Sequence, residues 1–236
     1  MVVQPRALVT RQKIIDTAVK VFAQNGYLET DLKAITRAAD LTNGAFYYHF
    51  DSKEALVAVI IEQGWSHVWD LIADRLDATE PGLENVIATT IAMTDQFAQD
   101  EFVWVASQLH QAFGLLQQEG RRDLQQRFEM FVEKVAKNIH NSDIRDDVTQ
   151  REVGELIWIM MQGSNQIHAP LPRAVKNWIF LLRSVVPLES LPHFEQVLTR
   201  TAAQYGVGAA EVSDRMIEEA TDPQETIAED DVGSRR

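Results

Sequence analysis

The sequence predicts an all-α protein, and three observations lead to that prediction. Apolar residues between positions 10 and 205 recur at intervals of three and four, the period of an amphipathic helix. No stretch in this region alternates apolar and polar residues as a half-buried strand does. Glycine, proline and short polar clusters divide the region into ten helical segments. With 236 residues, 45% of them hydrophobic, the chain can bury a sizeable core.

The first three expected helices are short and lie within the first 50 residues. The first covers residues 10–24 and ends at Asn25-Gly26, a typical C-terminal stop. The second covers residues 32–39 and the third residues 43–49, with the polar corner Asp40-Leu41-Thr42 between them. Two helices joined by so tight a turn are typical of a helix-turn-helix, which binds DNA.

Longer helices follow, separated by turn residues. Ser52 is expected to cap a helix over residues 53–76, and Ser190 the last helix. The helices between and after these caps are expected over residues 82–99, 101–118, 121–140, 149–167, 172–186 and 191–205. We therefore divide the chain into a helix-turn-helix domain (1–54), a larger helical domain (55–205) and an acidic, flexible tail (206–236).

Charge is distributed unevenly along the chain. The net charge is -13, which argues against a nucleic-acid partner for the molecule as a whole. Residues 1–60, however, carry seven basic and six acidic residues, a net of +1, whereas residues 211–236 carry a net of -6. The acidity therefore belongs to the larger domain and the tail, and the first 60 residues remain compatible with DNA.

Several classes of protein are disfavoured by composition. The chain has no cysteine, which excludes disulfides, thiolate catalysis and Cys-ligated metals. It has no apolar run long enough to cross a bilayer and no signal-peptide pattern, so we expect a cytoplasmic protein without a membrane partner. The six histidines are scattered, and no phosphate loop or nucleophile elbow is present. We expect no enzymatic activity, no cofactor and no metal site.

A more specific pattern covers residues 8–60. Its densest part is Leu41-Thr42-Asn43-Gly44-Ala45-Phe46-Tyr47-Tyr48-His49-Phe50-Asp51-Ser52-Lys53-Glu54-Ala55-Leu56. This string resembles the DNA-binding domain of the tetracycline-repressor (TetR) family. The turn of that family commonly holds glycine where this chain has Asp40, a residue type that tolerates left-handed backbone well.

The resemblance implies which residues contact DNA. Thr42 is expected to cap the third helix, and Asn43, Gly44 and Ala45 to reach base edges from its N-terminus. Asn43 is suited to pair with adenine or to read two adjacent base edges. Phosphate contacts are expected from Thr30, Lys33, Tyr47, His49 and Lys53.

Three aromatic residues and one histidine of this string have alternative roles. Phe46 and Phe50 fall on the apolar face and are expected in the core. Tyr48 suits either a groove contact or surface packing. His49 is also a residue type favoured at a helix C-terminus by the helix dipole.

The larger domain is rich in aromatic residues and methionine. Such stripes are more often core than ligand site, but the resemblance implies a small-molecule pocket among these helices. Polar residues within the stripes, among them Gln96, Gln111 and Gln162, are suited to orient a mostly apolar ligand. The expected pocket residues are Met93, Phe97, Trp104, Gln108, Phe131, Trp158 and Gln162.

The resemblance also implies a homodimer built from the helices over residues 149–167 and 172–186. The expected interface residues are Leu156, Ile159, Met160, Gly163, Val175, Trp178, Ile179, Leu182 and Val186. The segment from Trp178 to Pro187 is similar to regulators that sense gamma-butyrolactones. Their pocket tryptophan would fall near positions 127 and 128, where this chain has Arg127-Phe128.

Taken together, these patterns predict a dimeric repressor that a small apolar molecule releases from a pseudo-palindromic DNA operator. The alternative is an adaptor or ligand-binding protein of the same fold with weak or lost DNA binding. Asp31, Asp40 and the acidic larger domain favour that alternative.

Overall fold

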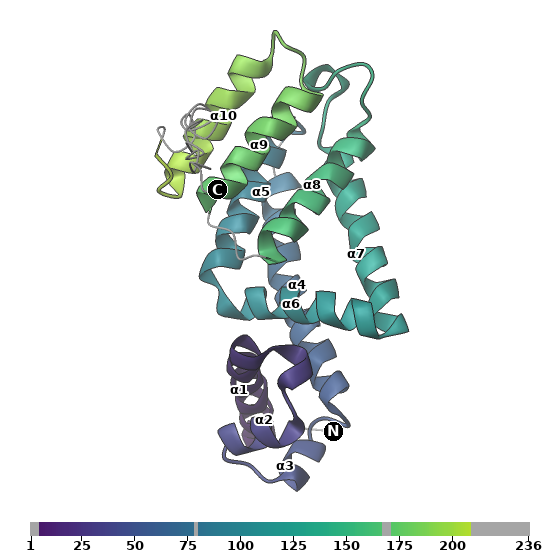
Figure 1. Cartoon of the computed structure of the whole chain (residues 1–236), viewed down its shortest axis with the longest axis vertical. Helices are drawn as coiled ribbons and strands as arrows, with labels where there is room; N and C mark the ends of the chain where they lie inside the picture. Colours follow the sequence, from purple (N-terminus) through teal and green to yellow (C-terminus); the bar gives the residue numbers. More distant parts are fainter. Residues whose placement is uncertain (1–4, 78–79, 167–170, 209–236) are drawn as a thin grey trace, which may run out of the picture.

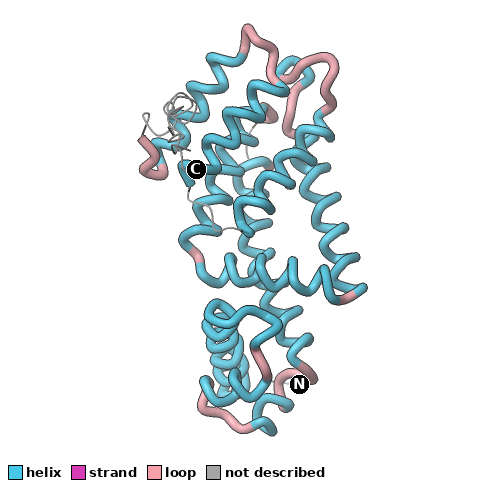
Figure 2. The backbone as a smooth tube through the Cα atoms, viewed as in Figure 1, coloured by secondary structure: helices cyan, strands magenta, loops and turns pink. Residues whose placement is uncertain are grey.

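The computed structural model describes residues 5–77, 80–166 and 171–208, and this part of the chain is all-helical. It contains ten α-helices and one short 3-10 turn, and Figure 2 shows helix along nearly all of the described chain. No strand occurs within these ranges. The all-α prediction is therefore confirmed for the described residues. Most of the expected acidic tail lies outside them.

Helices α1 (Pro5–Glu29), α2 (Leu32–Ala38) and α3 (Asn43–Tyr47) lie together at one end of the molecule (Figure 1). Helix α4 (Lys53–Leu76) leads from this end into the larger part. Helices α5 (Leu83–Gln99), α6 (Glu101–Leu116) and α7 (Gln118–Lys137) follow, then the 3-10 turn η1 (Asn141–Asp143). Helices α8 (Gln150–Gln166), α9 (Leu171–Val185) and α10 (Leu191–Gln204) complete the described chain.

Helix α6 lies across the molecule between the α1–α3 group and the rest of the larger part (Figure 1). It packs against α1 on one side and against α4 and α7 on others. The crossing with α4 is unusually close, because a Cβ added to Gly64 would stand 2.2 Å from the Cβ of Ala106. Glycine at this position therefore lets the two helix backbones approach.

Local capping residues account for where several helices begin. The side chains of Asp31, Thr42, Ser52 and Asp100 accept hydrogen bonds from backbone N–H groups in the first turns of α2, α3, α4 and α6. The predicted caps at Thr42 and Ser52 are confirmed. The predicted cap at Ser190 is wrong, because its side chain makes no such bond.

The first helix begins earlier than predicted, and helical structure also follows its predicted end. It begins at Pro5 rather than near Thr10. Gly26 breaks it as expected, with left-handed backbone (φ 73°), but helical hydrogen bonding resumes beyond the break and continues to Glu29. The predicted stop at Gly26 is therefore confirmed, and a short second helical segment follows it within α1.

A single hydrophobic core extends through the described chain. Phe46 and Phe50 are buried in it, as predicted. Trp65, Trp158 and Trp178 are buried in the larger part. None of the helices in the described ranges combines the length and the apolar character needed to cross a bilayer.

Candidate DNA-contact surface and interior site

Three short-range features define α2 and the turn that leads to α3. Asp31 Oδ1 accepts from the N–H of Ala34 at 2.7 Å and so begins α2. Asp40 takes the left-handed conformation (φ 53°) that the sequence predicts for the turn. The Leu41 N–H then donates to the Thr36 carbonyl at 2.9 Å, which closes the turn. The chain reaches Thr42 positioned to cap α3.

The N-terminus of α3 is open to solvent. Thr42 Oγ1 accepts from the N–H of Ala45 at 3.1 Å, while Asn43 and Gly44 are exposed and Ala45 is half-buried. Free N–H groups and the helix dipole make such an end attractive to phosphate and to base acceptors. These residues lie where sequence reasoning expects base contacts.

The aromatic residues of α3 and the turn after it divide between core and surface. Phe46 is fully buried and packs edge-on against Tyr47, whose side chain is 55% exposed. Tyr48 is 78% exposed and packs edge-on against the half-buried His49. Buried Phe46 therefore anchors α3 while two tyrosines with hydroxyl groups remain available to a ligand.

Two residues expected to contact phosphate have internal partners instead. Thr30 is buried and its hydroxyl donates to the Gly26 carbonyl at 2.7 Å. The Lys53 ammonium donates to the carbonyls of Tyr27 and Thr30, at 3.0 and 2.9 Å, and lies 4.0 Å from the centre of the Tyr27 ring. The Thr30 assignment needs correction, because a buried hydroxyl that is already bonded cannot reach a phosphate. Lys53 anchors the end of α1 in this arrangement.

Lys33 and Arg37, by contrast, are exposed on α2. Lys33 is one of the five phosphate contacts that the sequence predicts, whereas Arg37 was not among them. Arg11 of α1 lies with its guanidinium 4.9 Å from the centre of the Phe50 ring. Sequence reasoning also missed Thr36, whose buried hydroxyl donates to Asn43 Oδ1 at 3.1 Å.

The seven residues predicted to line a ligand pocket occupy four helices of the larger part. Met93, Phe97, Phe131 and Trp158 are buried, whereas Trp104, Gln108 and Gln162 are half-buried. The Phe131 and Trp158 rings are in contact, with centroids 5.3 Å apart. The Gln108 amide donates to the Asn165 carbonyl at 3.1 Å, so α6 and α8 meet here.

Several buried polar atoms in the same helices have no hydrogen-bond partner in the described part of the chain. They are Thr89 Oγ1 and Gln96 Oε1 on α5, Ser107 Oγ and Gln111 Nε2 on α6, and Asn165 Nδ2 on α8. A buried polar group without a partner costs about 1–3 kcal/mol, so these atoms favour a bound molecule or water that supplies partners. Gln96 and Gln111 are among the polar residues expected from the sequence.

A polar network that runs from the interior to the surface joins α4, α6 and α7 beside these residues. The Trp65 Nε1–H donates to His110 Nδ1 at 2.9 Å, which makes the neutral ring carry its proton on Nε2. That nitrogen lies 3.0 Å from Asp123 Oδ2 without the alignment of a good hydrogen bond. Arg127 bridges Asp123 at 2.9 Å and Glu62 at 2.7 Å. Burial lowers the pKa of His110 to about 4, with Arg127 acting in the same direction and Asp123 opposing it.

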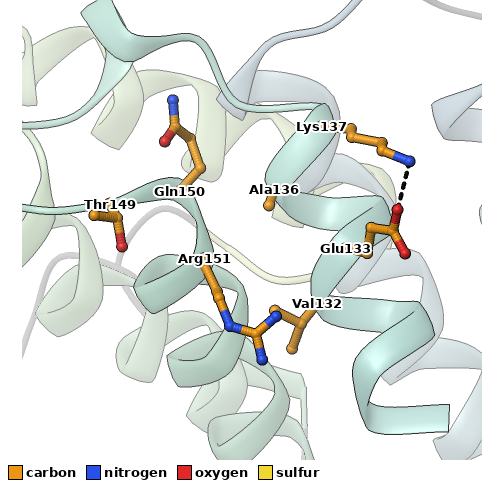
Figure 3. A pocket seen from close by; sticks show the side chains of 7 residues that line it. All are labelled: Val132, Glu133, Ala136, Lys137, Thr149, Gln150 and Arg151. Atoms are coloured by element: carbon orange, nitrogen blue, oxygen red, sulfur yellow. Dashed lines mark hydrogen bonds and ion pairs between the residues drawn. The ribbon is translucent and has the colours of Figure 1, made fainter. Parts of the chain in front are cut away.

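The cleft in Figure 3 is a separate, shallow feature between α7 and the start of α8. Its volume is about 350 Å³, and it is lined by Val132, Glu133, Ala136, Lys137, Thr149, Gln150 and Arg151. None of the predicted pocket residues lines it. Its charged groups are already paired, Lys137 with Glu133 and Arg151 with Glu129. The two cations of its lining therefore have partners within the chain. Within the described residues no His, Asp and Glu cluster is arranged to hold a metal.

The residues predicted for the dimer interface separate into two groups. On α8, Leu156 and Ile159 are 45% and 64% exposed, Gly163 is exposed and Met160 is half-buried. On α9 and just after it, Ile179 is half-buried. The other four expected residues are buried within the chain: Val175, Trp178, Leu182 and Val186.

The α9 part of the predicted interface is therefore corrected. Helix α9 turns that apolar stripe toward the elements that it packs against, α5, α8 and α10. Its exposed apolar residue is Phe180 (54%), which sequence reasoning did not select. Within α8 and α9 the exposed large apolar residues are thus Leu156, Ile159 and Phe180.

The N-terminal part of the chain matches a known protein family. Residues 14–60 match the model of the family described as bacterial regulatory proteins, tetR family. The chain is 41% identical over 68 residues to the A-factor receptor protein of Streptomyces griseus, which is 29% of this chain and 25% of that one. It is 34% identical over 89 residues to a helix-turn-helix repressor of Mycobacterium sp. (strain GP1), which is 36% of this chain and 45% of that one. The matches thus span less than half of these relatives.

Two solved structures are similar over most of the chain. A gamma-butyrolactone receptor (ArpA-like protein) superimposes with a TM-score of 0.69 at 26% identity, covering 84% of this chain and 99% of that one. CprB from Streptomyces coelicolor, in complex with its biological operator sequence, superimposes with a TM-score of 0.66 at 26% identity, covering 84% and 98%. The likeness therefore includes both the α1–α3 group and the larger helical part.

Proposed function

Because this chain belongs to the tetR family of bacterial regulatory proteins, we propose that it is a ligand-responsive transcriptional repressor. In this proposal it binds a pseudo-palindromic DNA operator as a homodimer, through the N-terminus of α3. The observation that carries the proposal is the exposed N-terminus of α3, capped by Thr42 and anchored by buried Phe46. A helix end presented in this way fits the major groove.

The DNA-contact residues that we propose follow from exposure and chemistry. Asn43, Gly44 and Ala45 face the bases, whereas Lys33, Tyr47 and His49 face phosphates, and Tyr48 serves one or the other. Arg37 joins Lys33 as an exposed cation on α2. Lys53 acts mainly by holding the end of α1, because its ammonium is bonded to two backbone carbonyls.

We divide the molecule as the sequence suggests. Residues 1–54 bind DNA, residues 55–205 bind the effector and form the dimer, and residues 206–236 form an acidic tail. The exposed apolar residues of α8 and α9 support a two-fold interface, because the same patch on two copies is self-complementary. A dimer of this kind would set two α3 helices about one DNA turn apart, roughly 34–36 Å.

The proposed effector is a small molecule bound among α5–α8. Unpartnered polar atoms on α5, α6 and α8 and the ring contact between Phe131 and Trp158 support this position. The effector would act by tilting α4, which begins at Lys53 beside the α1–α3 group and crosses α6 at Gly64. A coupling of about 1–3 kcal/mol would change operator affinity roughly 5- to 150-fold.

We further propose that the protein works in the cytoplasm, without enzymatic activity and without a cofactor. One of the named relatives is a receptor protein and the other a transcriptional repressor. The ionisable groups of the network that includes Arg127 are bonded to one another.

Salt-dependent DNA binding tests the proposal directly. We expect the full chain to bind DNA from its own upstream region, with affinity that falls as salt rises. Lys33→Ala and Arg37→Ala should each weaken binding to all sequences and reduce the slope of log affinity against log salt by about 0.9 per lost phosphate contact. The readout is fluorescence anisotropy at several salt concentrations.

Lys137→Ala is the matched control, because Lys137 is exposed at the far end of α7. Its slope should equal that of the unaltered protein. If Lys33→Ala and Arg37→Ala also left the slope unchanged, the proposed docking of α2 and α3 would be wrong. Absence of specific DNA binding under all conditions would favour an adaptor that has lost this activity.

A further inference from the structure

The side chain that begins the exposed end of α3 is held by a buried neighbour on α2. Asn43 is exposed, and its Oδ1 accepts from the hydroxyl of Thr36 at 3.1 Å. Thr36 itself is only 5% exposed. Its single hydroxyl hydrogen has one other acceptor nearby, the Lys33 carbonyl, at the longer distance of 3.3 Å. The shorter contact therefore links the two helices of the helix-turn-helix.

This contact fixes which end of the Asn43 amide faces outward. The oxygen and nitrogen of a side-chain amide point in different directions from the same carbon, so an oxygen directed at Thr36 turns Nδ2 away from it. The nitrogen carries two hydrogens and accepts none. Asn43 therefore presents hydrogen-bond donors to whatever approaches the end of α3.

We propose that Thr36 is a positioning residue that sets the base preference of Asn43, selecting guanine over adenine at the base pair facing the α3 N-terminus. The inference rests on the proposed DNA-binding function and goes beyond it by naming the base and the residue that determines it. In the major groove guanine offers two adjacent acceptors, N7 and O6. Adenine offers the N7 acceptor beside an N6 donor, which opposes an outward-facing Nδ2.

The same chemistry ranks the other bases. Thymine offers one acceptor, O4, and is an intermediate partner. Cytosine offers only the N4 donor and is the least favourable. A free asparagine, by contrast, pairs with adenine through its oxygen and nitrogen together. Releasing Asn43 from Thr36 should therefore shift preference from guanine toward adenine.

The experiment begins with selection of bound duplexes from a pool of randomised inverted repeats, using the full chain. The base pair that Asn43 reads is identified as the one whose preference disappears with Asn43→Ala. Affinities for the four bases at that position are then measured by anisotropy. We expect the unaltered protein to prefer guanine over adenine, and Thr36→Val to lower the guanine-to-adenine affinity ratio at least about fivefold.

Three further variants make the result specific. Thr36→Ser keeps a hydroxyl and should retain the guanine preference. Thr201→Val, at a threonine of α10 with similar burial, should leave the preference unchanged. Asn43→Asp keeps an acceptor toward Thr36 but turns a second acceptor outward, so it should exchange guanine for cytosine. Thr36→Ala replaces Thr36→Val if the valine variant fails to fold in a circular-dichroism melt.

The possible results separate the two ideas. An adenine preference in the unaltered protein, or an unchanged ratio in Thr36→Val, would overturn the role of Thr36 while leaving DNA binding intact. Failure of the full chain to select any sequence would overturn the proposed function, and the base preference with it. A fivefold loss with Thr36→Val that Thr36→Ser does not show would support the inference.

Discussion

Several side chains in this protein have partners that their residue type alone does not predict. Lysine at position 53 has the chemistry of a phosphate contact, yet its ammonium bonds the carbonyls of Tyr27 and Thr30. Those carbonyls lie at the end of α1, where the last helical carbonyls lack partners within the helix. The Lys53 ammonium therefore joins α4 to the end of α1 and stabilises the α1–α3 group.

Acidification should destabilise the fold through His110. Burial holds its pKa at about 4, below the ordinary value of 6.5. Below pH 6.5 the unfolded chain therefore takes up a proton that the folded protein does not. The contribution of His110 to the free energy of unfolding should be present in full above about pH 6.5. It should be lost progressively toward pH 4, by about 3 kcal/mol in total. The charged neighbours are Asp123 and Arg127 on α7, and Glu62 on α4 through Arg127.

Urea titrations between pH 7 and pH 5 measure this effect. His110→Gln keeps an acceptor for the Trp65 N–H but does not titrate, so its unfolding free energy should vary less with pH than that of the unaltered protein. His67→Gln is the control, because the His67 side chain is 53% exposed. Equal pH dependence in His110→Gln and the unaltered protein would show that another group is responsible.

Helices α4 and α6 cross at very close range. Gly64 meets Ala106 there, and the Trp65–His110 hydrogen bond lies one helical turn further along α6. Close backbone approach and a buried hydrogen bond together restrict how α4 can move relative to α6. This crossing is therefore the natural pivot for any tilt of α4.

Gly64→Ala should force the two helices apart, because its Cβ would stand 2.2 Å from that of Ala106. Overpacking of this kind costs about 1–3 kcal/mol, and we expect a lower free energy of unfolding together with altered operator affinity. Ala106→Gly in the same chain removes the clashing atom, so the double variant should recover most of both losses. A double variant no more stable than Gly64→Ala would contradict this account of the crossing.

The exposed apolar residues Leu156, Ile159 and Phe180 lie on α8 and α9. Figure 1 shows these two helices side by side at the end of the molecule opposite α3. A dimer formed there would leave both recognition helices free. The two copies would then present their α3 helices together to one operator.

Ile159→Glu and Phe180→Glu should each give a monomer, because a dimer would bury an unpaired charge at the two-fold interface. Sedimentation velocity measures the change, and operator affinity should fall with it. Leu115→Glu, at a residue of α6 that is 79% exposed, is the matched control and should remain dimeric. If all three variants behaved alike, the interface would lie elsewhere.

The features that the sequence predicts correctly are those that depend on short-range chemistry. Helical periodicity, the caps at Thr42 and Ser52 and the turn at Asp40 each involve residues within a few positions of one another. For the same reason most helix ends lie within three residues of their expected positions, and Phe46 and Phe50 are buried as predicted. The expected tail beyond residue 208 lies outside the described chain.

What each apolar or polar side chain contacts depends on tertiary packing and could not be predicted from the sequence. An apolar stripe shows that a helix face is covered, but not whether its own chain or a second copy covers it. Trp178 and Leu182 are therefore interior residues, although they were expected at a dimer interface, and Phe180 is the exposed one. Likewise Thr30, Thr36 and Lys53 find partners that the helix packing brings near. Burial and long-range hydrogen bonds depend on how helices meet in space, which periodicity along one chain does not specify.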